Sequence, residues 1–162
     1  MSKLRCQDKP GSELMLEKEE IREKIGQGWI KAELWFEVMT AEKELADTTL
    51  TDHVKAMRNL KDNYILSEKF EEAVEVKNPP REVKQAFSKV AQVEVLCKNI
   101  ETLLFTVIYF APSGVEIIEP KELTIGIETI QAIMNSVADV MHKLAAGGVG
   151  GVVISTRGKN PS

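Results

Sequence analysis

The residues best suited to chemistry in this 162-residue chain lie along one side of its last predicted helix. Glu128, Gln131, Asn135, Asp139 and His142 recur at steps of three or four residues, which places them on one helical face. A carboxylate three residues before a histidine can orient the imidazole or share a metal ion with it. Asn135, Asp139 and His142 therefore form a candidate polar site, and its alternative is the solvated face that every amphipathic helix has.

Metal and triad chemistry would need further residues. A zinc site takes four protein ligands, or three protein ligands and a water molecule. This helical face offers only Asp139 and His142. The other histidine, His53, follows Asp52, which a helix directs elsewhere, so no catalytic triad is predicted. We assign no metal, cofactor or catalytic residue, and favour a non-catalytic protein over an enzyme.

The cysteines and the glycine-rich segment have structural explanations. Cys6 and Cys97 belong to no CxxC pair and suggest no disulfide framework, which favours a reducing, cytoplasmic compartment. The GGVGG segment from Gly147 follows a helix and lacks the Lys-Ser/Thr of a P-loop. It is typical of a helix end with a flexible linker rather than of a phosphate-binding loop.

Composition excludes two classes of partner. The chain is 43% hydrophobic and 28% charged, as expected for a soluble globular protein, and its net charge of -4 disfavours binding to nucleic acid. Its longest apolar run, residues 103–111, is far shorter than a membrane-spanning helix, so no membrane contact is predicted.

Two stretches, residues 29–66 and 89–118, follow the same plan of strand, helix and strand. Phe36-Glu37-Val38-Met39 aligns with Val93-Glu94-Val95-Leu96 at an offset of 57 residues, and Thr49 aligns with Thr106. Residues alternating from Trp29 predict a first strand with one buried face, followed by a helix that Thr40 caps. The inner side of that helix is predicted to carry Leu45, Thr49, Leu50, Val54, Met57 and His53.

The remaining elements follow from the same signals. A second strand is expected over residues 64–76 as a charged edge strand or bulge, and one helical turn over residues 82–87. The third strand spans residues 91–97, Asn99 caps an almost wholly apolar helix, and residues 115–118 form the fourth strand. A surface helix ending at Gly26 and a long helix over residues 127–145 complete the chain.

Strand–helix–strand repeated twice predicts an α+β fold with a split β-α-β topology. It has a four-stranded antiparallel sheet, helices on one face and added N- and C-terminal helices. Residues 29–118 thus resemble the ferredoxin-like superfold. The whole body, including EPKELTI and NSVADVMHKLAAGG, is similar to a small family of uncharacterised archaeal proteins, and this resemblance implies no activity.

Known activities of that superfold need motifs that are missing. The third strand, VAQVEVL, lacks the aromatic residues and glycine of RNA-recognition domains. The first loop, Met39-Thr40-Ala41-Glu42, lacks the CxxC of heavy-metal carriers, the glycine-rich phosphate cradle of acylphosphatases and the glycine of amino-acid-binding ACT domains.

Large apolar side chains that nothing in the predicted fold covers are the remaining candidates. Trp35 lies among polar residues on the open face of the sheet, beside Glu37 and Glu94. It either packs under the N-terminal helix or in a loop corner, or marks a dimer or ligand face. Phe105 and Tyr109, on the outer side of the apolar helix, need cover from another element or a second subunit.

We therefore predict three segments: a flexible tail with a surface helix (1–28), a ferredoxin-like domain with a C-terminal helix (29–146), and a glycine-rich flexible tail (147–162). The expected function is a non-catalytic binding or assembly module, with a regulatory role as one form of it. The chain should form a homo-oligomer and leaves room for a small-molecule ligand. The alternative is a small-molecule or metal-binding enzyme that uses the polar residues of the last helix.

Overall fold

The structure, a computed structural model, describes residues 16–79 and 84–147. The chain divides into two compact units, Met1–Lys121 and Glu122–Ser162. Helices and an antiparallel sheet make up the described residues, which confirms the α+β class. The predicted tails and the GGVGG segment beyond Gly147 lie outside the described residues, as does Cys6.

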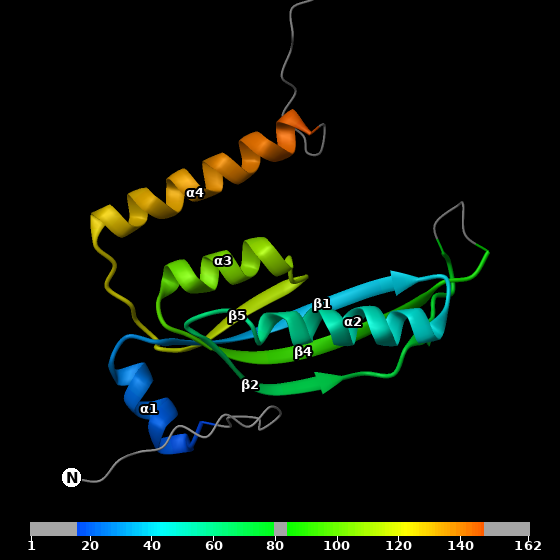
Figure 1. The fold of residues 1–162 in the computed structure, drawn as a ribbon, viewed down its shortest axis with the longest axis horizontal. Coiled ribbons are helices and arrows are strands. Elements are labelled where there is room, and N and C mark those ends of the chain that lie inside the picture. The colour runs from blue at the N-terminus through cyan, green and yellow to red at the C-terminus, as the bar shows by residue number, and fades with distance from the viewer. Residues whose placement is uncertain (1–15, 80–83, 148–162) are drawn as a thin grey trace, which may run out of the picture. The chain divides into compact units, whose positions relative to one another are not determined.

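The first unit contains three helices and five strands among its described residues. Their order is α1 (Lys18–Gly26), β1 (Ile30–Thr40), α2 (Lys43–Met57), β2 (Asn63–Phe70), β3 (Val74–Glu75), β4 (Phe87–Cys97), α3 (Ile100–Phe110) and β5 (Gly114–Glu119) (Figure 1). The strands lie in the order β2-β4-β1-β5, and β3 also pairs with β4. All of these pairings are antiparallel.

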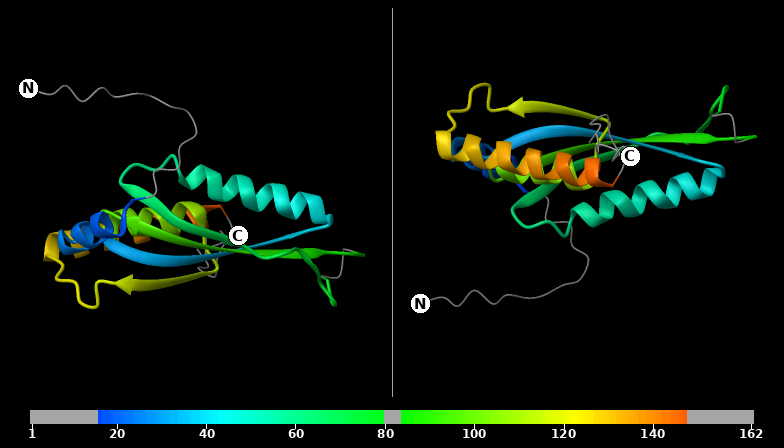
Figure 2. Two further views of the ribbon diagram at one scale, coloured as in Figure 1. Left: turned by 90° about the horizontal axis from the view of Figure 1, so that it is seen from below. Right: turned by 90° about the horizontal axis from the view of Figure 1, so that it is seen from above.

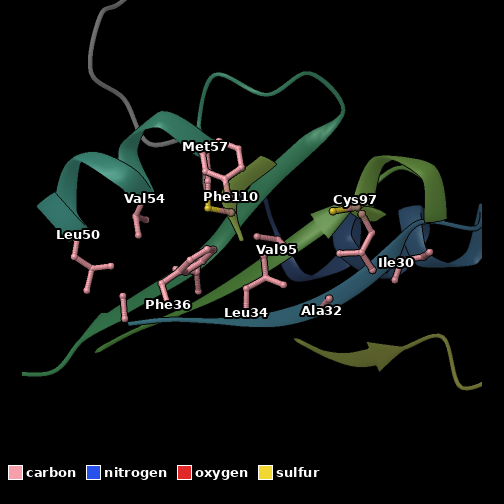
Figure 3. Packing of buried hydrophobic residues seen from close by; sticks show 13 residues of the cluster. Ile30, Ala32, Leu34, Phe36, Leu50, Val54, Met57, Val95, Cys97 and Phe110 are labelled. Atoms are coloured by element: carbon pink, nitrogen blue, oxygen red, sulfur yellow. The ribbon is translucent and has the colours of Figure 1, made fainter. Parts of the chain in front are cut away.

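The core lies between the sheet and the helices α2 and α3. Every second residue at the start of β1 is buried, and β4 contributes a matching row, as the alternation of apolar residues predicts. Figure 3 shows Leu50, Val54 and Met57 of α2 pointing toward these strands, together with Phe110 of α3. Both helices therefore cover the same face of the sheet, and Figure 2 shows α2 along one side of the strands.

The internal repeat is visible in the geometry. β1 and β4 each have 11 residues and are offset by 57 residues at both ends. Trp35 and Gln92, which occupy the same position of the repeat, are also direct partners across the two strands. On the helix side, the equivalent residues His53 and Phe110 meet as well, with His53 Nε2 2.9 Å from the Phe110 carbonyl oxygen. An approximate two-fold axis thus passes through both positions.

The sheet has five strands, where the sequence predicts four. The segment expected as one strand over residues 64–76 leaves the ladder after Phe70 and returns as β3. Ala73 in this break is buried, while its neighbours Glu71 and Glu72 are exposed. Keeping the small apolar residue inside and both carboxylates in water interrupts the strand.

Three local predictions need correction. Thr40 ends β1 and its hydroxyl donates to the Glu42 carbonyl at 2.7 Å, so it does not cap α2. The helical turn expected over residues 82–87 is absent from its described part, because Phe87 already pairs with Glu75 of β3. On α2, Leu45 and Thr49 are exposed. The buried residues of this helix are Ala46, Leu50, Val54 and Met57.

The capping of α3 agrees with the sequence. Asn99 has extended backbone angles, and its side-chain oxygen accepts from the Thr102 amide at 2.8 Å. The helix ends at Phe110, and the C-cap residue Ala111 adopts a left-handed conformation with φ 46°. Capping residues thus define both ends of α3.

The second unit contains one helix in its described part, α4 (Ile127–Ala146), close to the predicted range. No residue of α4 is buried. Among residues 16–79 and 84–147, no helix has the length and apolar character that crossing a membrane requires.

Candidate assembly surface

Trp35 lies on the face of the sheet opposite to the core. Its indole packs across to the start of β5, where a Cβ added to Gly114 would lie 3.3 Å from the indole Cε3. The neighbouring Ser113 donates two hydrogen bonds to the Trp35 carbonyl, from its amide at 2.7 Å and from its hydroxyl at 3.1 Å. Trp35 is half-buried. This contact comes from strand β5, which neither of the two packing alternatives in the sequence analysis included.

The carboxylates around Trp35 are already engaged across the strands. Glu37 accepts a 2.6 Å hydrogen bond from the Ser88 hydroxyl, and Glu94 forms a 3.2 Å ion pair with Lys31. These two pairs are equivalent under the offset of 57 residues. Glu94 lies opposite Glu33 of β1, so Glu37 and Glu94 lie on opposite sides of Trp35 along the strands. This face is a polar, internally paired surface rather than a converging acid–base site.

Helix α3 presents a very different surface. Leu103, Thr106 and Phe110 are its buried residues, so its opposite side faces outward. On that side Phe105 is 61% exposed and Tyr109 is 80% exposed. Within the first unit, Tyr109 keeps a ring contact with Phe110, with 5.6 Å between the centroids.

Strand β5 adds two exposed apolar residues that the sequence reading did not single out. Val115 is 43% exposed and Ile117 is 51% exposed. Their direct partners on β1, Leu34 and Ala32, are core residues, so their side chains belong to the helix-covered side of the sheet. The sequence signal that could have identified Val115 and Ile117 is a run of apolar residues in an edge strand. The α3–β5 surface is defined by these four residues: Phe105, Tyr109, Val115 and Ile117.

The predicted site residues thus separate onto two faces. Trp35, Glu37 and Glu94 lie on the open side of the sheet, whereas Phe105 and Tyr109 lie on the helix side. Val115 and Ile117 are exposed on the helix side as well, whereas Met39 is the large apolar residue exposed next to Glu37 on the open side. Exposed aromatic and branched residues are common in protein interfaces, where they serve as anchors.

The polar residues of α4 interact with one another. Asn135 accepts a 3.2 Å hydrogen bond from Gln131, and Asp139 forms a 2.6 Å ion pair with Lys143. Asp139 is therefore engaged by a lysine, and the structure gives no contact between it and the exposed His142. Among the described residues, no group of three or more His, Cys, Asp or Glu side chains is placed to hold a metal ion.

A buried polar cluster lies beneath α3. Asn63 donates to the Thr106 hydroxyl at 3.2 Å, and that hydroxyl donates to the Thr102 carbonyl at 2.9 Å. Burial raises the pKa of the neighbouring Cys97 thiol to about 12, although a hydrogen bond with Thr106 opposes the shift. A thiol with this pKa stays protonated at neutral pH and is a poor nucleophile. Cys97 is therefore a core residue, as its strand position predicts.

Comparison with models of protein families gives a match. The MJ0538 family model matches residues 31–157, which include nearly all of the sheet, α3 and α4. No curated protein and no solved structure matches the chain.

Proposed function

Because the chain belongs to the MJ0538 family, an uncharacterised family named for an archaeal protein, we propose a function from its surface. The protein is a non-catalytic assembly module whose α3–β5 surface binds a second copy of the same chain. The observation that carries this proposal is the exposure of Phe105 and Tyr109 on a helix whose other side is fully packed.

The internal repeat supports the proposal through a built-in comparison. In α2, the positions equivalent to Phe105 and Tyr109 are Thr48 and Asp52, which are ordinary exposed polar residues. Both helices pack on the same core, so folding does not require aromatic residues at these outer positions. Leaving two aromatic rings in water costs free energy that burial against a partner recovers, at about 25 cal/mol per Å² of apolar area.

A second copy is the partner that the chain itself supplies. An isologous two-fold contact places the same four residues on each side of the interface, so an apolar surface always meets an apolar surface. All four side chains are uncharged, which avoids local repulsion between two chains that each carry a net charge of -4. A stable contact of this kind buries on the order of 800 Å² on each partner, with aromatic anchors near its centre.

The finer fold assignment belongs to the same proposal. We place residues 30–119 in the ferredoxin-like superfold, which the strand order β2-β4-β1-β5 and the two helical crossovers support. Strand β3 is then an addition to its four strands. We also propose a cytoplasmic location, which the buried free thiol of Cys97 favours.

The proposal is tested by giving α3 the residues of α2. The double variant Phe105→Thr/Tyr109→Asp should form a smaller assembly than the wild type in light scattering at micromolar concentration, with unchanged far-UV circular dichroism. Leu45→Asp is the matched control, because it removes a 51% exposed leucine from the outer side of α2 and should leave the assembly intact. A monomeric wild type, or a double variant with wild-type mass, would refute the proposal.

A further inference from the structure

Helix α4 carries a regular apolar stripe in its 20 residues. Its members recur at alternating steps of three and four residues, and each is between 38% and 77% exposed. They are Ile127, Ile130, Met134, Val137, Met141 and Leu144.

Alternating steps of three and four are the heptad spacing of helices that pack against other helices. The residues that flank the stripe in such a packing are uncharged: Gln131, Ile133, Ala138, Val140 and Ala145. The charged residues of α4 lie on its far side, where Asp139 and Lys143 pair with each other. A second helix can therefore pack along the stripe without desolvating any charge of α4.

We propose that α4 pairs with α4 of a second copy in antiparallel orientation. The stripe is symmetric about the point between Asn135 and Ser136, so two antiparallel copies bring apolar residues level at every layer. The layers are Ile127 with Leu144, Ile130 with Met141, and Met134 with Val137.

The helix dipoles favour the antiparallel orientation over the parallel one. A parallel pair would place like partial charges side by side at each end, whereas an antiparallel pair places the positive end of one helix beside the negative end of the other.

This inference rests on the proposed assembly function, but it assigns a different surface, in the second unit of the chain. The two can therefore fail separately. If both interfaces form, the Phe105→Thr/Tyr109→Asp variant loses one contact and keeps the α4 pair, whereas a charge in the stripe does the reverse.

The test uses full-length chains with complementary charges in one layer. Ile130→Glu alone and Met141→Lys alone should each weaken the α4 contact roughly 100-fold, because a charge enters an apolar layer without a partner. An equimolar mixture of the two variants should recover the wild-type mass in light scattering, since the introduced glutamate of one chain then faces the introduced lysine of the other. Asn135→Glu, on the polar side of α4, is the control and should keep the wild-type mass.

A second mixture determines the orientation. Ile130→Glu mixed with Ile130→Lys should not recover the wild-type mass, because antiparallel pairing separates the two positions by about 16 Å along the helix axis. Recovery in this mixture would indicate a parallel pair and overturn the proposal. An Ile130→Glu variant with wild-type mass would also overturn it, and a lower Tm without a change in mass would assign the stripe to packing within one chain. In either case the result for the Phe105→Thr/Tyr109→Asp variant would still decide the α3–β5 surface.

Discussion

The two halves of the first unit, residues 30–70 (β1, α2, β2) and residues 87–119 (β4, α3, β5), share a framework and differ in their outer faces. Their first strands have the same length and their helices begin 57 residues apart. Yet α2 presents Thr48 and Asp52 to solvent where α3 presents Phe105 and Tyr109. The difference separates what folding requires from what an interface requires.

The comparison is sharpest for the thiol of Cys97, which occupies the position equivalent to the half-exposed Thr40. Two variants isolate one thiol each: Cys6→Ser keeps only Cys97, and Cys6→Ser/Cys97→Ala/Thr40→Cys keeps only the introduced cysteine. Cys97 should react with a thiol reagent about 10³-fold more slowly than the introduced cysteine. The reason is that labelling Cys97 requires an opening of the core that costs on the order of 4 kcal/mol or more. Both thiols should react at one rate in denaturant, and equal rates in the folded chain would contradict the assigned burial.

The same thiol should make stability depend on alkaline pH. Burial raises the pKa of Cys97 from 9.0 to about 12. Because the folded pKa lies above the unfolded value, the contribution is fully present below pH 9.0 and is lost as the pH rises toward about 12. The free energy of unfolding of the wild type should fall more steeply over this window than that of Cys97→Ala. Parallel curves for the two chains would rule out this contribution.

Core truncations should affect both halves alike. Leu50 of α2 is 0% exposed and Leu103 of α3 is 3% exposed. Each substitution by alanine should lower the free energy of unfolding by about 2–5 kcal/mol in urea titrations, because it opens a cavity in a shared core. Leu45→Ala, at an exposed position of α2, should change it by less than about 1 kcal/mol. A large effect in only one half would show that the halves do not fold as one unit.

The two threonines of the repeat should respond differently. Thr106→Val removes the hydroxyl that accepts from the buried Asn63, so it should cost about 1–3 kcal/mol of stability in urea titrations. Thr49→Val, at the equivalent exposed position of α2, should stay within about 0.5 kcal/mol of the wild type. Equal effects would mean that the hydrogen bond to Asn63 contributes nothing.

The smallest effect is expected where the halves touch through Trp35. Gly114→Ala places a methyl group 3.3 Å from the indole, which must shift slightly to accept it. We expect a change in tryptophan emission with a stability change below about 1 kcal/mol. Gly126→Ala is the control, since a Cβ there meets no atom within 4 Å, and its emission should equal that of the wild type.

Local signals made much of this fold predictable. Alternation defined β1, and Asn99 marked the start of α3 as an N-cap. The buried side of α2 was harder to predict, because Leu45 looks like a better core residue than Ala46. The observed spacing of Ala46, Leu50, Val54 and Met57 places a small residue under the sheet instead. Which face is buried depends on a rotation that packing determines and composition does not.

The candidate surface was only half visible in the sequence. The aromatic residues of α3 stood out because the helix is apolar on every side. Val115 and Ile117 did not, since only the pairing of β5 with β1 shows which side of the sheet they occupy. Likewise, the hydrogen-bond partners of Glu37 and Glu94 depend on strand register, which the sequence left open.

The meeting of Trp35 with Gln92 on the approximate two-fold axis has a consequence for how the surface can change. In a symmetric dimer of one β-α-β segment, every substitution would appear twice, once on each side of the axis. Joining two such segments in one polypeptide removes that obligation, so each position can be tuned independently of its twin. A single chain can therefore keep one helix compatible with water and reserve the other for contact.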